Sequence, residues 1–133
     1  MMSIDRRILI ADDDIEIRLG VADLLEPLGL EIMLAETGTQ ALQILRNGGM
    51  HLALLDYRMP GATGLDILAA IQNELMNIPA ILYSADAAGD VGILAMQAGA
   101  FAVLSKPVVP AVLRREVVRA LKLPPSMGLT GLA

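Results

Sequence analysis

The sequence changes from aliphatic to acidic within seven residues, Ile8-Leu9-Ile10-Ala11-Asp12-Asp13-Asp14. A continuous apolar run of this kind is typical of a strand buried on both faces, as in a parallel sheet. Four more short aliphatic runs follow, at residues 32–35, 52–55, 80–83 and 102–104. We therefore predict five buried strands.

Segments with helical spacing lie between these runs. The first has apolar residues at positions i, i+4, i+7, i+8 and i+11, and we expect it to end at residues 27–29; these residues are Ile17, Val21, Leu24, Leu25 and Leu28. Further helices are predicted at residues 39–45, 65–75, 91–98 and 110–121. This alternation predicts an α/β fold, a single doubly wound domain in which five helices cover both faces of a five-stranded parallel sheet.

The size and composition agree with one folded domain. The chain has 133 residues, of which 55% are hydrophobic and 19% are charged, and this balance argues against disorder. The segment that begins at Pro124-Pro125 has turn-forming residues and no helical or strand period. We therefore assign residues 1–123 to the domain and residues 124–133 to a linker stub or C-terminal tail.

The charge and residue counts exclude several classes of function. Residues 1–90 carry a net charge of −9 and residues 91–133 one of +4, so a basic footprint for direct nucleic-acid binding is absent. There is no cysteine and only one histidine, His51, which argues against thiolate and histidine-rich metal sites. The longest uncharged run, 91–105, is shorter than the ~20 residues of a membrane span. With no signal peptide at the start, we expect a cytoplasmic protein without membrane contact.

Polar side chains follow four of the five predicted strands. Asp12-Asp13-Asp14 follows the first, Asp56 the third, Ser84 the fourth and Ser105-Lys106-Pro107 the fifth. Because the carboxyl ends of parallel strands share one edge of the sheet, where open α/β folds bind their ligands, we expect these groups to lie together.

Three of these carboxylates form a candidate metal site. Asp12, Asp13 and Asp56 would repel one another if left unneutralised. Oxygen ligands favour a hard cation such as Mg²⁺, whereas zinc and copper favour thiolates and imidazoles. Asp14 precedes a helix and is interpreted as its N-cap. A turn role for Asp56, with its carboxylate accepting backbone hydrogen bonds, is the alternative interpretation.

Lys106 and Ser84 complete the candidate site. A lysine at the end of an apolar strand costs desolvation unless an anion lies opposite, and its compact charge suits a carboxylate or a phosphoryl group. Ser84 is followed by the small Ala85, which leaves space beside its hydroxyl group. An exposed lysine and an ordinary turn serine are the alternatives.

In this order and spacing the motifs resemble the receiver domain of bacterial two-component response regulators, of which the single-domain chemotaxis regulator is the best-known form. The resemblance covers about residues 6–122. It rests on Ile8 to Asp14, Leu54 to Gly61 with Gly64, Ser84-Ala85, Gly99-Ala100 and Ser105-Lys106-Pro107. It implies a flavodoxin-like fold with strand order 2-1-3-4-5.

The resemblance also implies a role for each site residue. Asp56 would accept a phosphoryl group from the phosphohistidine of a sensor histidine kinase or a phosphotransfer protein. Lys106 and Ser84 would contact the phosphoryl oxygens. Mg²⁺ would be held by Asp12 through water, by Asp13, by Asp56 and by the backbone carbonyl of Arg58.

Such a domain is a regulatory phospho-acceptor of a phosphorelay and catalyses only its own phosphorylation and dephosphorylation. Phosphorylation would shift the conformation of the surface formed by residues 91–98, 102–104 and 110–121, which would bind an output protein or a second copy of the chain. On the last helix, Arg115, Arg119 and Lys122 form a basic stripe that is either a solvated face or part of this surface.

Two features depart from the family pattern. The position three residues before the lysine is commonly aromatic in the family but is Val103 here, so a ring-flip switch is excluded at this position. We expect Phe101, in the same strand, to share the face of Val103. The positions that tune dephosphorylation are Arg58 and Asp86, which we expect to pair across the mouth of the site.

Two alternative functions are compatible with these motifs. One is a degenerate receiver that binds a partner without phosphorylation, which the valine at position 103 leaves open. The other is a Mg²⁺-dependent phosphohydrolase with an aspartate nucleophile. Such hydrolases place two acids after their first strand, whereas the acids here follow strands one and three. A phosphotransfer role for His51 is disfavoured because this role normally belongs to an exposed helix.

Overall fold

The computed structural model describes residues 5–127. The elements follow the order β1 (Arg7–Ala11), α1 (Ile15–Leu25), a 3₁₀ turn η1 (Glu26–Leu28), β2 (Glu31–Ala35), α2 (Gly38–Arg46), β3 (Leu52–Asp56), α3 (Gly64–Asn73), β4 (Ala80–Ser84), α4 (Asp90–Gln97), β5 (Ala102–Ser105) and α5 (Pro110–Ala120). All ten predicted strands and helices are present, with boundaries that mostly differ by one or two residues. The prediction that all five strands are buried is wrong for β2 and β5, which are the edge strands of the sheet and are only partly buried. Within residues 5–127, no helix has the length and apolar character needed to cross a bilayer.

The five strands form one sheet in the order β2-β1-β3-β4-β5, and every neighbouring pair is parallel. The chain therefore has the flavodoxin-like topology that the resemblance implied. Because all strands run in the same direction, the carboxyl ends of β1, β3, β4 and β5 meet at one edge of the sheet.

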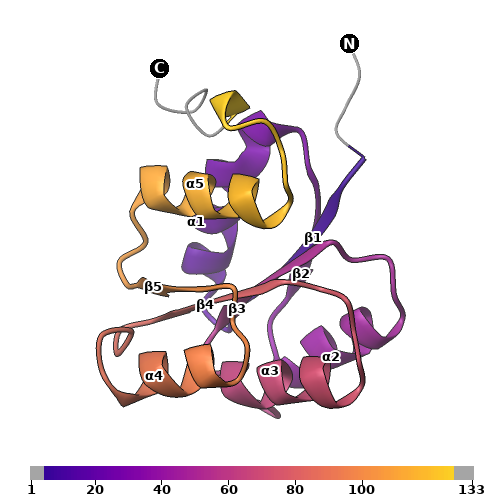
Figure 1. The fold of residues 1–133 in the computed structure, drawn as a ribbon, viewed down its shortest axis with the longest axis vertical. Coiled ribbons are helices and arrows are strands. Elements are labelled where there is room, and N and C mark those ends of the chain that lie inside the picture. The colour runs from indigo at the N-terminus through magenta and orange to yellow at the C-terminus, as the bar shows by residue number, and fades with distance from the viewer. Residues whose placement is uncertain (1–4, 128–133) are drawn as a thin grey trace.

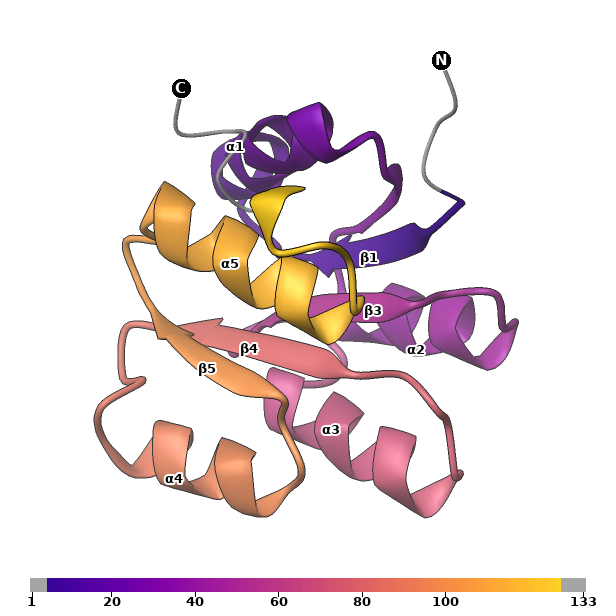
Figure 2. The same cartoon turned by 45° about the horizontal axis from the view of Figure 1, so that its top comes forward.

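Helices cover both faces of the sheet, with α1 and α5 on one side and α2, α3 and α4 on the other (Figure 1, Figure 2). Successive strand residues point to opposite faces, so each strand contributes to two separate cores. In β1, for example, Leu9 packs in the cluster under α2, α3 and α4, whereas Ile8 and Ile10 pack under α1 and α5. Met127, in the predicted tail, also packs against the α1 and α5 cluster. Residues 128–133 of that tail lie outside the described residues.

The first helix begins as the sequence predicts. The Asp14 carboxylate accepts hydrogen bonds from the backbone N–H groups of Glu16 (2.9 Å) and Ile17 (3.3 Å), which confirms Asp14 as the N-cap. The helix ends at Leu25, and the chain leaves η1 through Gly29 in the left-handed conformation.

Leu75 lies two residues after the end of α3, at a position that favours glycine. Its φ is +55° and its side chain is 89% exposed. The N–H of Leu75 donates to the carbonyl of Gln72 and the N–H of Met76 donates to that of Ile71, the pattern of a helix end with a left-handed residue. The corresponding residue after α4 is Gly99, with φ +91°.

We expect Leu75→Gly to raise the free energy of unfolding by about 0.5–1 kcal/mol. The substitution relieves roughly 1–2 kcal/mol of left-handed strain, which exceeds the entropy that glycine adds to the unfolded chain. Urea unfolding followed by circular dichroism measures the change. Gly99→Ala is the matched control and should destabilise the fold, because its φ of +91° is strained for a residue with a Cβ atom. A destabilised Leu75→Gly protein would contradict this account of the turn.

Candidate metal and anion site

The predicted polar side chains meet at the carboxyl edge of the sheet. A hollow of about 550 Å³ lies there, and its lining includes Asp12, Asp13, Asp56, Arg58, Ser84, Asp86 and Lys106. The Lys106 ammonium group forms an ion pair with Asp56, with Nζ 2.8 Å from Oδ1, and lies 3.9 Å from Asp12 Oδ2. The sequence prediction of an anion opposite Lys106 is therefore confirmed, and in this structure the anion is Asp56.

Asp12 is fully buried and is held by several hydrogen bonds. Its Oδ1 accepts from the N–H of Asp14 (2.8 Å) and its Oδ2 from the hydroxyl group of Tyr83 (3.1 Å). Its backbone carbonyl accepts from the buried guanidinium of Arg18 (2.7 Å). Burial raises the pKa of Asp12 to about 6, and the negative charge of Asp56 adds to this effect. Ionisation of the Asp12 carboxyl group therefore costs free energy, and a cation in the hollow would offset this cost.

The carboxylates fit a hard metal ion. One oxygen from each of Asp12, Asp13 and Asp56 lies within 4.8 Å of the others. Asp13 is exposed, and its carboxylate accepts no hydrogen bond from the described residues, so its oxygens are available as ligands. An all-oxygen set with room for water suits Mg²⁺. Arg58 also lines the hollow, where its backbone carbonyl would serve as a further oxygen ligand.

Gly64, the first residue of α3, allows this helix to approach the end of β3. A Cβ atom at this position would lie 2.7 Å from the backbone oxygen of Asp56 and 2.4 Å from Leu82 Cδ1. A side chain here would push the helix away from the site. Thr63 and Asp66 fix the start of the helix through reciprocal side-chain to backbone hydrogen bonds.

Ser84 lies at the end of β4 with its hydroxyl group at the hollow. It is 5% exposed, and its Oγ accepts a hydrogen bond from the N–H of Asp86 (3.0 Å). The hydroxyl hydrogen remains available to donate to a ligand. Asp86 in turn accepts a hydrogen bond from the N–H of Val91 in α4 (3.4 Å).

The expected ion pair between Arg58 and Asp86 is not formed in this structure. The Arg58 guanidinium lies over the ring of Tyr57 instead, 5.9 Å from its centroid. Asp86 is occupied at the start of α4, where its carboxylate also lies against Gly89. Both side chains are exposed, so solvent competes with the pairing that the sequence suggested.

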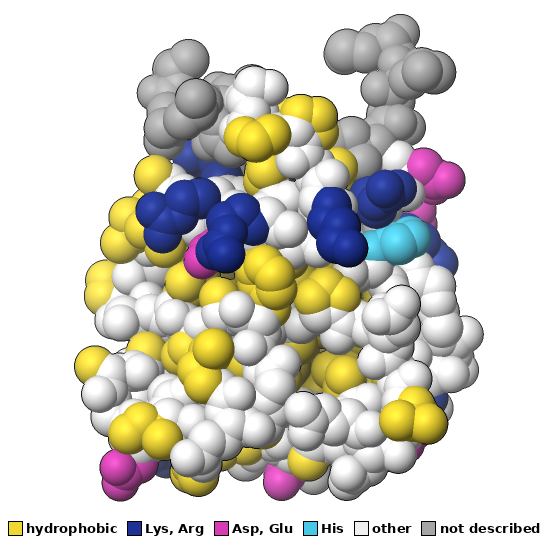
Figure 3. All heavy atoms as spheres, viewed as in Figure 1, with side chains coloured by type: hydrophobic (Ala, Val, Ile, Leu, Met, Phe, Trp, Pro, Cys, Tyr) yellow, Lys and Arg dark blue, Asp and Glu magenta, His cyan; other side chains and the backbone are white. Residues whose placement is uncertain are grey.

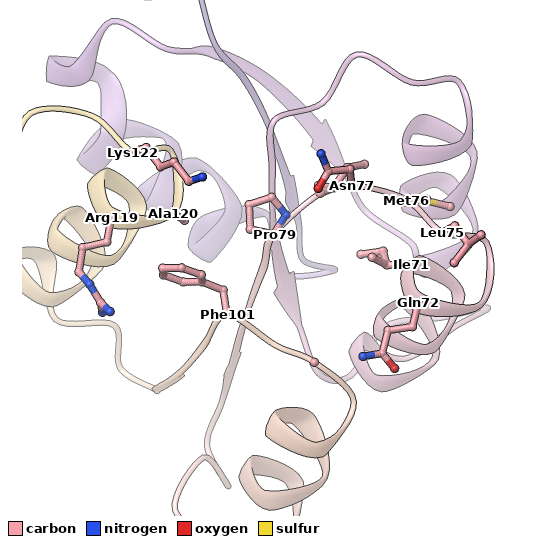
Figure 4. Close-up of a pocket in the computed structure, with 12 residues that line it drawn as sticks. Ile71, Gln72, Leu75, Met76, Asn77, Pro79, Phe101, Arg119, Ala120 and Lys122 are labelled. Atoms are coloured by element: carbon pink, nitrogen blue, oxygen red, sulfur yellow. The ribbon is translucent and has the colours of Figure 1, made fainter.

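Phe101 does not share the face of Val103. The strand β5 begins only at Ala102, and Phe101 lies in the preceding bend, with its ring 5.4 Å from the guanidinium of Arg119 in α5 (Figure 4). Val103 packs against the other core cluster, under α2, α3 and α4. Phe101 therefore lines a separate hollow of about 720 Å³, together with Leu75, Pro79 and residues of α5.

The basic stripe and the histidine lie away from the acidic site. Figure 3 shows Lys and Arg side chains (dark blue) in a band across one face, ending beside the single histidine (cyan). Arg119 of this stripe pairs with Glu116 on its own helix, which neutralises part of the charge. His51 lies in the turn before β3, and its Nδ1 accepts a hydrogen bond from the N–H of Arg7 (3.0 Å).

Two residues that contact Asp12, namely Arg18 and Tyr83, were not predicted from the sequence. Arg18 occurs on a buried position of an amphipathic helix, and nothing in its spacing indicates that it reaches back to the β1 end. Tyr83 did offer a signal, because it is the only residue with a polar side-chain atom in the apolar run 80–83, directly before Ser84.

Fold and site together define a doubly wound α/β protein in which three carboxylates and one ammonium group meet at the carboxyl edge of the sheet, a set that suits a cation and an anion. The family model of the response regulator receiver domain matches residues 8–118. The chain therefore belongs to the response regulator receiver domain family, whose members act in two-component signalling.

Individual relatives agree with this assignment. The chain is 35% identical over 114 residues to the chemotaxis protein CheY of Pseudomonas aeruginosa, covering 84% of this chain and 92% of CheY. It is 34% identical over 118 residues to the response regulator protein PilR of the same species, covering 89% of this chain but 26% of PilR. A CheY-like receiver domain structure from Methanospirillum hungatei superposes with a TM-score of 0.81 at 30% identity, covering 88% of this chain and 94% of that one.

Proposed function

We propose that this chain receives a phosphoryl group on Asp56, in the presence of Mg²⁺, from the phosphohistidine of a sensor histidine kinase or a phosphotransfer protein. The observation that carries the proposal is the contact between Lys106 Nζ and Asp56 Oδ1 at 2.8 Å, beside the carboxylates of Asp12 and Asp13. A nucleophilic carboxylate, a fixed cation and a metal-binding carboxylate set are the parts that phosphoryl transfer needs. The family is generally regulatory, and we propose that transfer to and from Asp56 is the only chemistry of this domain.

In the transfer step, a carboxylate oxygen of Asp56 attacks phosphorus, and the bond between phosphorus and the donor nitrogen breaks. The electron pair of that bond leaves with the imidazole, and Asp56 becomes an acyl phosphate. Lys106 is already beside the nucleophile and would neutralise one phosphoryl oxygen. Ser84 would donate its hydroxyl hydrogen to another. Both groups stabilise charge that is placed on the phosphoryl oxygens during transfer.

Asp13, Asp56 and the Arg58 carbonyl would hold Mg²⁺ directly, and Asp12 would hold it through water. When bound, the ion would supply positive charge that offsets the charge of the phosphoryl oxygens. The buried Asp12 supplies a carboxylate whose orientation is fixed by Tyr83 and the N–H of Asp14.

The surface that responds would be formed by α4, β5 and α5. Three large apolar side chains of α4, Ile93, Leu94 and Met96, are each about half exposed and are available to an output protein or a second copy of the chain. Ser84 connects the site to α4 through Asp86, which lies against its first turn. With Val103 at the family's aromatic position, Asp86 is the residue we propose to modulate both the lifetime of the acyl phosphate and the position of α4. A cytoplasmic location stays a prediction.

Incubation with MgCl₂ and acetyl phosphate tests the proposal. Intact-protein mass spectrometry should detect an increase of one phosphoryl group that is lost on standing and is absent without Mg²⁺. Asp56→Asn should give no adduct. Asp23→Asn, an exposed aspartate on α1, is the matched control and should be labelled as well as the wild type.

Three results would contradict the proposal. Equal labelling of Asp56→Asn would place the acceptor elsewhere. Hydrolysis of added phosphomonoesters, with no adduct on Asp56, would favour the phosphohydrolase. Absence of both adduct and hydrolysis would favour a degenerate receiver.

A further inference from the structure

The side chain of Tyr83 reaches the acidic site from inside the core. It lies in β4, is 1% exposed and packs in the cluster under α1 and α5. Its hydroxyl group donates to Asp12 Oδ2 at 3.1 Å and also lies 3.3 Å from the backbone oxygen of Ala11. Both acceptors belong to the end of β1, so one hydroxyl group ties β4 to the metal-binding turn.

The ring of the same residue lies beside the lysine. Lys106 Nζ is 5.3 Å from the centroid of the Tyr83 ring, within the ~6 Å range of a cation–π contact. The ammonium group is also 2.8 Å from Asp56 Oδ1 and 3.9 Å from Asp12 Oδ2. The ring and the two carboxylates together fix the position of the one ammonium group at the site.

Packing alone does not require a tyrosine at this position. The residues that precede the ends of the neighbouring strands are aliphatic, namely Leu55 in β3 and Leu104 in β5. A leucine at position 83 could fill apolar space but would leave Asp12 Oδ2 without its hydroxyl donor. A buried carboxylate oxygen that loses its donor carries a penalty, so the hydroxyl group acts on Asp12 specifically.

We propose that Tyr83 is a positioning residue for both charges of the site. Its hydroxyl group orients the Asp12 carboxylate for Mg²⁺, and its ring holds the Lys106 ammonium group beside Asp56. The ring role rests on the proposed phosphoryl transfer, whereas the hydroxyl role concerns metal binding alone. The family commonly has an aromatic side chain at the position of Val103 in β5. Here the aromatic ring lies on the neighbouring strand, at Tyr83 of β4, where it contacts the site lysine.

Calorimetric titration with MgCl₂ tests the hydroxyl role. Partners that orient metal ligands typically change metal affinity about 10–100-fold, and we expect Tyr83→Phe to raise the Mg²⁺ dissociation constant about tenfold. A merely structural role would lower the melting temperature in EDTA but leave the dissociation constant within twofold of wild type, and that result would overturn the proposal. Because the titration uses no phosphoryl donor, its result does not depend on whether Asp56 is phosphorylated.

The rate of labelling by acetyl phosphate at saturating Mg²⁺ tests the ring role. Tyr83→Phe keeps the ring and should retain the wild-type rate, whereas Tyr83→Leu should lower the rate about tenfold. A tenfold change corresponds to about 1.4 kcal/mol, which is the size of one cation–π contact. Equal rates for the two variants would overturn the ring role. Absence of labelling in the wild type would instead contradict the proposed function and leave the titration result standing.

Tyrosine emission gives an independent signature, because the chain has two tyrosines and no tryptophan. In a Tyr57→Phe background, Tyr83 is the sole emitter. A hydrogen bond to a carboxylate quenches tyrosine emission, so Asp12→Asn should raise the emission in this background. Saturation with Mg²⁺ should leave the emission quenched, because the hydrogen bond from Tyr83 keeps Asp12 oriented in the metal-bound protein. Emission that rises to the Asp12→Asn level at saturating Mg²⁺ would show that the hydrogen bond is broken in the metal-bound protein, and it would overturn the hydroxyl role.

Discussion

Lys106→Met should slow phosphoryl transfer from acetyl phosphate to Asp56 by about two to three orders of magnitude, the usual effect of removing one preorganised group that stabilises charge. Methionine keeps the length of the aliphatic stem and removes only the ammonium group, which lies 2.8 Å from Asp56 Oδ1. Mass spectrometry over time, at saturating Mg²⁺, measures the rate.

The same substitution should not weaken Mg²⁺ binding. Lys106 competes with a metal ion for the Asp56 carboxylate, so its removal should leave the Mg²⁺ affinity equal or higher. Lys122→Met, at an exposed residue after α5, is the matched control and should retain the wild-type rate. A Lys106→Met protein that is labelled within threefold of the wild-type rate would contradict the assigned role.

Without Mg²⁺, the free energy of unfolding should fall by about 2 kcal/mol as the pH rises from 4 to 7. The pKa of Asp12 is near 6 in the folded protein and 3.8 in its unperturbed state. Folding therefore favours the protonated form, and its stabilising effect is complete below pH 3.8 and is lost as the pH rises through 6. Each pKa unit corresponds to about 1.4 kcal/mol, which sets the size of the effect.

Urea unfolding at pH 4, 5, 6 and 7, in EDTA and in MgCl₂, measures this dependence. Saturating Mg²⁺ should restore the stability at pH 7, because it binds the ionised folded form. Asp12→Asn removes the titrating group and should flatten the profile, whereas Asp23→Asn should keep the wild-type slope. A profile in EDTA that rises between pH 5 and 7 would contradict the raised pKa of Asp12.

The parts of the fold and site that follow from strand topology could be predicted from sequence. Asp12, Asp56, Ser84 and Lys106 each end a buried apolar run, and a parallel sheet brings such ends together. The predicted ion pair between Arg58 and Asp86 was wrong because exposed side chains have several possible partners of similar energy. Arg58 lies over the ring of Tyr57, and Asp86 accepts a hydrogen bond from the backbone of α4.

The side-chain contacts of Phe101 and Tyr83 could not be predicted from the sequence either. The face of Phe101 depends on the residue at which β5 begins, and a shift of one residue moves a side chain to the other face of a strand. The reach of Tyr83 to Asp12 depends on how β4 lies relative to β1, two strands away with β3 between them. Apolar periodicity indicates burial of the ring but carries no information about what its hydroxyl group meets.

The contact between Lys106 and Asp56 sets an order of events. Asp12, Asp13, Asp56 and Lys106 together carry a formal net charge of −2, and Asp14, Asp86 and Arg58 on the same hollow add a further −1, so the site repels an anionic phosphoryl donor. A divalent cation would neutralise the charge of Asp12, Asp13, Asp56 and Lys106, and a donor would then meet a smaller electrostatic barrier. The single positive charge of Lys106 does not balance the carboxylates, so we expect ordered binding, with the metal ion first and the phosphoryl donor second.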